Sequence, residues 1–452
     1  MELTQGNEVT NSSFQKMIDG NFGTGKATGT IGGGSYIITV ARTGTNYQMD
    51  SSGKISTLTE VPIDFAAGIL EGNGTENDPY VINSVEDLLA FAYNVNSKSN
   101  SYENKYVTLG RNLDLKDENS YVDATTKYSL KQYNCYGSDY DSGYAPDESS
   151  NYSVLDCMNG CYNGKAFIPV GISQYRAEDQ ARSFKGFFDG CGNYIKNLDS
   201  RFEFCVGLFG EVSGNVVIKN VGIESGNIQS SGNYAAGILA SVGENTDIII
   251  DNCYNKAQII GQNAGGIVGR NTSSKLTVTN CYNSGTIVCA TSRSSGEVGG
   301  IVGYDSAFEE GFIENCYNTG TVNSSSGSVG GICSYSGYQY IKNCYNSGTV
   351  TTGSGLAGGI ISQFGNSSMN ISQCYNFGTI YSGNSEANGI GSNNYGDREI
   401  VDKCYNSGII SSSTSTGGSC GIITSKNTNV TISNCHNTGT ISRNCIKIWR
   451  NC

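Results

Sequence analysis

The sequence predicts an all-β protein, a parallel β-helix in which each coil of about 30 residues supplies three short strands. A Cys-Tyr-Asn motif, with His replacing Tyr in the last copy, recurs between Cys253 and Cys435 at intervals of 28, 35, 28, 30, 30 and 31 residues. Runs like "AGGIVG" and "GTIVCA" keep the same rhythm, and all three runs alternate apolar and polar residues as strands do. One repeat cannot bury its apolar face alone, whereas stacked coils can, each hydrogen-bonded to the next.

The composition favours strands and argues against two classes of partner. The 452 residues include 61 Gly and 4 Pro, and only 15% are charged, a mixture typical of strands joined by tight turns. A net charge of −12 argues against nucleic acid and anionic membranes, because both need basic patches. No apolar run reaches the ~18 residues of a membrane span. The opening "MELTQGNEVT" is polar, so we expect any export signal or anchor to lie outside this chain.

Equivalent positions of successive coils should stack into columns. We expect an inward column of thiols that pack as small apolar groups: Cys253, Cys281, Cys316, Cys344, Cys374, Cys404 and Cys435. We expect a corner column whose amides hydrogen-bond along the axis and tolerate left-handed backbone: Asn255, Asn283, Asn318, Asn346, Asn376, Asn406 and Asn437. The glycines that follow should take positive φ: Gly285, Gly320, Gly348, Gly378, Gly408 and Gly439.

Metal binding and disulfide bonding are the alternatives to this structural role of the cysteines. Zinc needs ligands that converge on one point, commonly in closely spaced Cys pairs, and this chain has a single His, His436. A disulfide needs Cβ atoms roughly 3.5–4.5 Å apart, whereas in-register strands leave them about 4.8 Å apart. We therefore predict reduced, buried thiols and neither a metal nor a cofactor.

A short helix is predicted before the regular coils. Ser84 followed by Asp87 is a capping-box pattern, and an apolar stripe at helical spacing follows it. The predicted helix spans about 85–94, and we expect it to cover the open apolar end of the solenoid, as a terminal cap must.

The chain divides into three parts by sequence pattern. Residues 1–65 suggest a small region with a β-hairpin, from the runs "SYIITVA" and "NYQMDSSGKIS". Residues 66–165 should form an N-terminal cap and first coil, and residues 166–452 the repeat β-helix with a C-terminal cap. The last nine residues, "NCIKIWRNC", are expected to plug the final coil.

Residues 116–166 interrupt the first coil, and the segment is too long for a plain turn. It is rich in tyrosine and acidic residues, and insertions in solenoids project from one face, where they often bind partners. Such a segment suits contact with a glycan or a protein. The candidate contact residues are Tyr133, Tyr136, Tyr140, Tyr144, Asp139 and Asp141. The alternative is a surface decoration without a partner.

Several runs occur together in this chain: "VGGIVG" and "NCYNSGT" in the coils, "GNGTENDPYVINSVEDLLAFAYNVN" at 72–96 and "FKGFFDGCGNYIKNL" at 184–198. This combination resembles the GLUG-repeat proteins of bacterial cell surfaces, whose repeat also occurs beside immunoglobulin A peptidases. The resemblance covers roughly residues 70–440. It implies a right-handed β-helix in an exported or surface-attached protein.

Three function classes fit this pattern. The first is a non-enzymatic surface or secreted rod for adhesion or display, with a partner on a host or neighbouring cell surface. The second is a β-helix carbohydrate-active enzyme of the polysaccharide lyase or hydrolase type, which would need acidic clusters on one face of the coils. The third, an intracellular scaffold, is raised by the many thiols. We favour the first class, because the regular coils carry few acids and a catalytic His would rest on His436 alone.

Overall fold

The computed structural model describes most of the repeat region and its N-terminal cap. For four strands between residues 25 and 57 it describes the backbone alone. The described ranges are 70–96, 100–116, 167–172, 183–202, 205–230, 234–243, 246–272, 274–289, 296–307, 310–337, 339–365, 369–393, 399–413, 418–425 and 430–442.

Two antiparallel hairpins lie in the N-terminal region, where the sequence predicted one. The first joins β1 (Gly25–Ile31) to β2 (Gly34–Val40), and the second joins β3 (Tyr47–Met49) to β4 (Ile55–Thr57). The "SYIITVA" run therefore lies in β2 and pairs with β1, whereas the "NYQMDSSGKIS" run contains both β3 and most of β4 and forms the second hairpin by itself.

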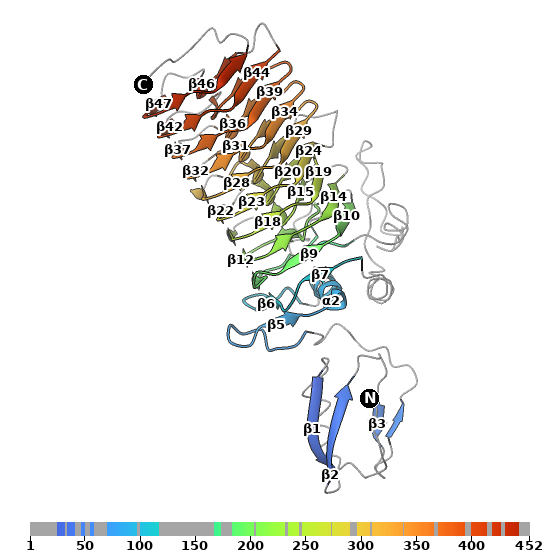
Figure 1. Ribbon diagram of the computed structural model, residues 1–452. Coiled ribbons are helices and arrows are strands. Elements are labelled where there is room, and N and C mark those ends of the chain that lie inside the picture. The colour runs from blue at the N-terminus through green and yellow to red at the C-terminus, as the bar shows by residue number, and fades with distance from the viewer. Residues whose placement is uncertain are drawn as a thin grey trace, which may run out of the picture.

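The rest of the described chain is a parallel β-solenoid of about nine coils, as predicted (Figure 1). Each regular coil has five short strands instead of the predicted three. For example, the run "LTVTNCYN" is divided between β22 (Lys275–Thr279) and β23 (Tyr282–Asn283), because Asn280 takes a left-handed conformation with φ 54° and turns the chain. The run "EVGGIVGYD" is likewise divided between β25 (Glu297–Gly299) and β26 (Val302–Asp305), at Gly300 and Ile301.

The five strands of each coil contribute to five parallel sheets, which we name A to E in the order the chain visits them. Sheet A contains β5 (Tyr80–Ile82), β6 (Tyr106–Leu109), β8 (Phe187–Asp189), β12 (Asn215–Lys219), β17 (Asp247–Asp251), β22 (Lys275–Thr279), β27 (Gly311–Glu314), β32 (Gln339–Lys342), β37 (Asn370–Ser372), β42 (Glu399–Asp402) and β47 (Val430–Ser433). Sheet B contains β7 (Leu113–Asp114), β9 (Tyr194–Lys196), β13 (Gly222–Ile223), β18 (Tyr254–Asn255), β23 (Tyr282–Asn283), β28 (Tyr317–Asn318), β33 (Tyr345–Asn346), β38 (Tyr375–Asn376), β43 (Tyr405–Asn406) and β48 (His436–Asn437).

The other three sheets complete each coil. Sheet C contains β10 (Leu198–Phe202), β14 (Gly226–Ser230), β19 (Gln258–Gly261), β24 (Thr286–Cys289), β29 (Thr321–Ser324), β34 (Thr349–Thr352), β39 (Thr379–Ser382), β44 (Ile409–Ser412) and β49 (Thr440–Ser442). Sheet D contains β15 (Tyr234–Ala236), β20 (Asn263–Gly265), β25 (Glu297–Gly299), β30 (Ser328–Gly330), β35 (Ala357–Gly358), β40 (Ala387–Asn388) and β45 (Ser419–Cys420). Sheet E contains β11 (Phe209–Val212), β16 (Leu239–Val242), β21 (Val268–Asn271), β26 (Val302–Asp305), β31 (Cys333–Ser336), β36 (Ile361–Phe364), β41 (Gly391–Asn393) and β46 (Ile423–Ser425).

The predicted helix is present as α2 (Val85–Asn96), which is two residues longer than expected. Its start is capped as the sequence indicated: the Asp87 backbone N–H donates to Ser84 Oγ over 3.1 Å, and the Asp87 carboxylate accepts from the Asn83 N–H. Phe91 is fully buried, and its ring contacts those of Phe184 and Phe209 in the first coils. The helix therefore covers the N-terminal end of the solenoid core.

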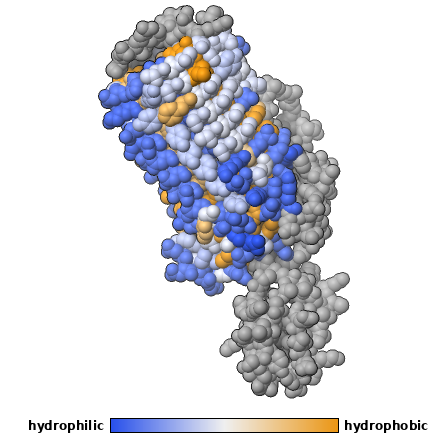
Figure 2. Space-filling model, viewed as in Figure 1, coloured by the Kyte–Doolittle hydropathy of each residue, from blue (hydrophilic) through white to orange (hydrophobic). Residues whose placement is uncertain are grey.

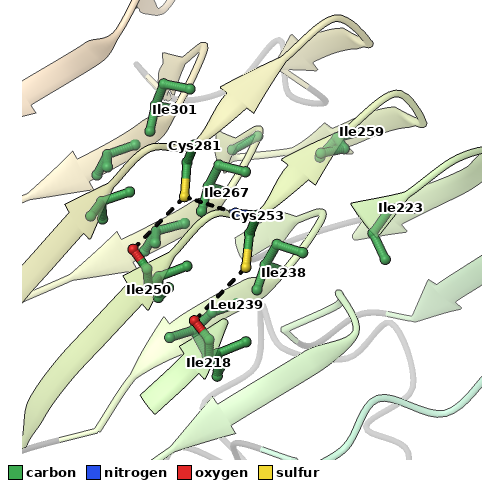
Figure 3. Packing of buried hydrophobic residues seen from close by; sticks show 14 of the residues in the cluster. Ile218, Ile223, Ile238, Leu239, Ile250, Cys253, Ile259, Ile267, Cys281 and Ile301 are labelled. Carbon is green, nitrogen blue, oxygen red and sulfur yellow. Dashed lines mark hydrogen bonds between the residues drawn. The ribbon is translucent and has the colours of Figure 1, made fainter. Parts of the chain in front are cut away.

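One continuous apolar core follows the axis, from Leu70 in the cap to Cys435 in the last described coil. Figure 3 shows how Ile218, Ile250 and Ile301 pack around the cysteines in the middle of the rod. Among the described residues, no helix is long and apolar enough to cross a membrane.

Candidate functional site

The seven asparagines of the corner column form a buried hydrogen-bonded ladder. Each side-chain Nδ2 donates to Oδ1 of the asparagine in the next coil, over 2.5–2.9 Å, from Asn255 through to Asn437. The same amide groups also bond their own turns, since Asn283 Nδ2 donates to Gly285 O and Asn283 Oδ1 accepts from Gly285 N–H. Each interior amide therefore joins neighbouring coils, and those of Asn283, Asn318, Asn346 and Asn376 also bond the turn that follows them.

Two conformational predictions for this corner are wrong. The asparagines of the ladder lie in strands, and the left-handed residues stand one position before each cysteine: Asn252, Asn280, Asn315, Asn343, Gln373, Lys403 and Asn434. Gly285, Gly320, Gly348, Gly378, Gly408 and Gly439 do not have left-handed φ values. Glycine is required there by space: a Cβ on Gly285 would lie 2.1 Å from the Ala257 carbonyl oxygen and 2.8 Å from Asn255 Nδ2.

The seven cysteines of the inward column are buried, and all twelve cysteines that the structure describes are free thiols. Each column Sγ lies 3.0–3.4 Å from a carbonyl oxygen two residues earlier and 3.4–3.8 Å from one in the preceding coil. Figure 3 shows this for Cys253 and Cys281, which reach Ile218 O and Ile250 O. The thiols thus serve as weak donors as well as apolar groups, and burial raises the pKa of Cys281 well above its ordinary value.

The tyrosines of the Cys-Tyr-Asn motif form a ladder on the outer surface of sheet B. The rings of Tyr254, Tyr282, Tyr317 and Tyr345 stack face to face, with centroids 4.9–5.0 Å apart and interplanar angles of 2–8°. These side chains are half-buried, because their faces cover one another. Sequence reasoning missed this ladder, although an outward position between an inward Cys and an inward Asn at the same spacing predicts it.

The ladder changes character at its C-terminal end. Phe377 is half-exposed, and its ring lies 6.3–6.5 Å from those of Tyr345, Tyr375 and Tyr405. His436, which replaces a tyrosine, packs on Tyr405 with ring centroids 4.4 Å apart. The only histidine of the chain is therefore the last rung of an aromatic column.

The N-terminal rung of the ladder carries a hydrogen-bonded carboxylate. Tyr254 Oη donates to Glu224 Oε2 over 2.8 Å, and Lys256 Nζ lies 3.0 Å from the same carboxylate. Partial burial works to raise the pKa of Glu224, but the hydrogen bonds from Tyr254 and Lys256 outweigh it and hold that pKa below its usual range. Burial and the bond to this carboxylate raise the pKa of Tyr254 above its ordinary value.

Two further carboxyl groups sit in unusual surroundings in one coil. Burial raises the pKa of Glu297, on β25, to about 7, and Ser334 Oγ donates to its carboxylate over 2.5 Å. Burial likewise raises the pKa of Asp305, on β26, to about 7, against hydrogen bonds from the Ala307 N–H and Asn271 Nδ2. Glu297 is the first residue of its strand.

The candidate contact residues of the insertion, Tyr133, Tyr136, Tyr140, Tyr144, Asp139 and Asp141, lie outside the described residues. The structure does describe where the segment leaves and rejoins the solenoid. The Leu115 N–H donates to Lys196 O over 3.0 Å, and the Phe167 N–H donates to Asp199 O over 2.6 Å. Both ends therefore attach to neighbouring positions of the β9–β10 segment.

The visible outer surface of the coils is mostly hydrophilic or of intermediate hydropathy (Figure 2). Figure 2 shows a pale to blue face with separated orange patches. Exposed large apolar side chains are spread over the rod: Ile249, Phe312, Tyr340, Phe377, Tyr381, Ile400, Ile409 and Ile441. Within the described ranges, no three His, Cys, Asp or Glu side chains gather as a metal site.

Comparisons with known proteins give limited similarity. No protein-family model matches the chain. The chain is 24% identical over 250 residues to Halomucin of Haloquadratum walsbyi, a match that covers 54% of this chain and 2% of that protein. Among solved structures, the crystal structure of a "putative immunoglobulin A1 protease" from Bacteroides ovatus is similar, with a TM-score of 0.38 and 17% identity. That alignment covers 86% of this chain and 83% of the other.

Proposed function

We propose that this chain is a non-enzymatic rod of a cell-surface or secreted protein, used for adhesion or display. The observation that carries the proposal is the unbroken asparagine ladder from Asn255 to Asn437, because it makes successive coils structurally equivalent and ties each to the next. A solenoid of equivalent, linked coils is better suited to be a stiff spacer than to carry a single catalytic site, which needs different residues at one place. The resemblance to GLUG-repeat surface proteins and the similarity to a small part of halomucin support the same function.

The inserted segment 116–166 is our candidate for the part that meets a glycan or a protein. Real interfaces concentrate their energy in a few aromatic or Arg residues. The insertion supplies Tyr133, Tyr136, Tyr140 and Tyr144 with acids beside them, whereas the coil tyrosines use their faces to stack on one another. Its two ends meet the solenoid at neighbouring residues, Lys196 and Asp199, which supports treating it as a removable appendage.

A β-helix carbohydrate-active enzyme is the alternative. The carboxylates of the regular coils support it less well than they support a non-enzymatic rod, because other residues of the coils bind them. Glu297 is bound by Ser334, and Asp305 is buried and bound by Asn271, so both act as packing groups between coils. Glu224 is neutralised by Lys256 and accepts from Tyr254. A glycosidase would instead hold two carboxyl groups across a space for the sugar.

The test is deletion of residues 119–163, closed by a short Gly-Ser bridge. We expect binding to cell-surface extracts and glycan arrays to fall at least tenfold, while the thermal melt of the rod changes by no more than a few degrees. The matched control is Tyr282→Ala, which removes one coil tyrosine and should leave binding unchanged.

Other outcomes would decide against the proposal. Binding that survives the deletion but is lost in Tyr282→Ala would place the contact surface on the coils. Depolymerisation of a polysaccharide by the full chain, lost in Glu297→Gln, would favour the enzyme.

A further inference from the structure

The tyrosine ladder packs the outer face of sheet B, and its stacked phenols are also close enough to one another to react together. Tyr254, Tyr282, Tyr317 and Tyr345 follow one another in strict register, since Tyr254 pairs with Tyr282, Tyr282 with Tyr317 and Tyr317 with Tyr345 in the backbone ladders. Their ring centroids are 4.9–5.0 Å apart, and each phenol edge borders solvent. Phenols held this close can exchange an unpaired electron without any movement of the backbone.

The two ends of this array differ chemically. At the N-terminal end, Tyr254 already donates its proton to the Glu224 carboxylate, so loss of an electron can be accompanied by transfer of the proton along that bond. The lower face of the Tyr254 ring is covered by backbone, because a Cβ on Gly222 would lie 2.0 Å from Tyr254 Cζ. At the other end, the ring of Phe377, which has no hydroxyl group to deprotonate, contacts both Tyr345 and the next tyrosine in register, Tyr375.

We propose that the ladder is a site of oxidative cross-linking, in which a one-electron phenol oxidant joins Tyr254 and Tyr282 through their ortho carbons as dityrosine. The oxidant class we name is a haem peroxidase with hydrogen peroxide, as found outside cells. This modification is independent of the proposed binding function.

The reaction balances as follows. Each of the two phenols loses one electron and one proton, and these reduce one hydrogen peroxide to two waters through the peroxidase. One carbon–carbon bond forms between the rings, two ring C–H bonds break, and both hydroxyl groups are restored when aromaticity returns. The ring centres of an ortho-linked biaryl lie closer together than the 5.0 Å between the centroids of Tyr254 and Tyr282, so coupling requires the two stacked rings to turn edge to edge and to tilt toward each other.

The site should be selective for its first two rungs. A radical formed on any rung can move to its neighbours, but it is best stabilised where a base takes up the proton, which is at Tyr254 beside Glu224. Coupling there links β18 to β23 and closes a covalent loop between adjacent coils. Such a link would make the middle of the rod harder to unravel.

The experiment treats the purified full-length chain with a haem peroxidase and hydrogen peroxide, then measures dityrosine fluorescence. Tryptic peptides are read by mass spectrometry. The expected main intramolecular product joins the peptide 220–256, through Tyr254, to the peptide 276–293, whose single tyrosine is Tyr282. We expect this product to exceed the Tyr282–Tyr317 product severalfold.

Variants separate the chemistry from folding. Tyr254→Phe keeps the ring stack and should abolish the product. Glu224→Gln keeps a hydrogen-bond partner but removes the base, and should lower the Tyr254–Tyr282 yield severalfold relative to Tyr282–Tyr317. The matched control is Glu314→Gln, which removes a carboxylate that pairs with Lys342 within sheet A and should leave the product ratio unchanged. Native circular dichroism establishes that each variant is folded.

Two results would overturn the inference. One is dityrosine found only in other tyrosines, such as the stacked Tyr304–Tyr335 pair, or only between molecules. The other is an unchanged Tyr254–Tyr282 fraction in the Glu224→Gln variant, which would remove the role of the carboxylate.

Discussion

At the residue scale, one short motif supplies three different columns. In "Cys-Tyr-Asn" the thiol points into the core, the phenol points outward and the amide points inward again, as the strand period of two requires. The phenols and the amides then meet their own copies in the next coil, and the thiols meet the backbone of the preceding coil. The thiols contact carbonyl oxygens, the phenols stack and the amides hydrogen-bond, so one motif stabilises the stack in three ways.

Removing one interior rung of the asparagine ladder should be costly. Asn318→Ala deletes the bonds to Asn283 and Asn346 and the bonds that close its own turn at Gly320. Because buried polar partners are left behind, we expect a loss of about 2–4 kcal/mol in unfolding free energy, measured by denaturant titration. Asn437→Ala, at the half-buried end of the ladder, should cost less than half as much. Equal losses of unfolding free energy in the two variants would contradict the larger contribution assigned to a buried interior asparagine.

The column thiols should be unreactive in the native protein. Cys344 is fully buried, whereas Cys191 is exposed in a turn, so a thiol reagent should label Cys191 quickly and the column only after denaturation. Cys344→Ala should lower the unfolding free energy by about 1–3 kcal/mol, because it leaves a cavity. Cys344→Asp should cost more, because it buries a charge. Rapid labelling of several column thiols in the native state would contradict the buried role.

At the element scale, the short strands of a coil are set by its corners. A left-handed residue such as Asn280 separates sheet A from sheet B, and the glycine–isoleucine step at Gly300 separates sheet D from sheet E. The first corner also carries side-chain bonds between coils, since Asn343 Nδ2 donates to Asn315 Oδ1 over 2.6 Å. Asparagine suits this position because it tolerates the left-handed region and offers a short amide for the neighbouring coil.

The coil that contains β25 and β26 should make the protein more stable in mild acid than in base. The pKa values of Glu297 and Asp305 are raised to about 7 in the folded state, from 4.5 and 3.8. Between about pH 4 and pH 7 the folded chain therefore holds protons that the unfolded chain has released, so unfolding free energy falls as pH rises through this window and is level above it. Across this window the unfolding free energy should fall by up to about 3 kcal/mol through Glu297 and up to about 4 kcal/mol through Asp305.

Thermal melts from pH 4 to pH 8 measure this dependence. The double variant Glu297→Gln with Asp305→Asn keeps most of the hydrogen-bonding groups and should flatten the curve in this window. A melt temperature that rises from pH 5 to pH 8 in the parent protein would contradict the assignment.

At the scale of the whole molecule, the two ends of the solenoid differ in how their apolar core is covered. Helix α2 covers the N-terminal end, with Phe91 inside the core. At the C-terminal end, Ile441 is 39% exposed, whereas the equivalent Ile410 and Ile380 in the two preceding coils are fully buried. The sequence predicts that residues 444–452 plug this end.

Deletion of residues 443–452 should therefore make the rod associate end to end. Uncovered strand edges and an apolar end are a template for another chain. We expect the molar mass of the deletion variant, measured by light scattering, to grow with protein concentration. The molar mass of the intact chain should stay constant. Adding Ile441→Lys to the deletion should suppress the association by placing a charge on the exposed end. A deletion variant that remains monomeric would show that the segment is not the cover.

The columns were predictable from spacing, but their local geometry was not. Positions such as Cys281 and Asn283 could be aligned because the repeat length is nearly constant. The left-handed conformation was assigned to Asn283 and Gly285, although it belongs to Asn280, because all three are residue types that turns favour. Spacing alone cannot choose among neighbours three residues apart. Gly285 is required because the Ala257 carbonyl oxygen of the preceding coil leaves no space for a Cβ. That contact cannot be predicted from the residues next to Gly285 in the sequence.

By itself, the sequence determined that this protein is a stacked parallel β-solenoid with a helical cap, because repeat length, strand alternation and a capping box are local properties of the chain. The tertiary structure alone decided what each column does. Whether two tyrosines stack, whether two amides share a hydrogen bond and whether Glu297 loses its solvent all depend on the distance and register between coils. Those quantities arise only when residues about thirty positions apart are brought to the spacing of neighbouring strands, about 4.8 Å.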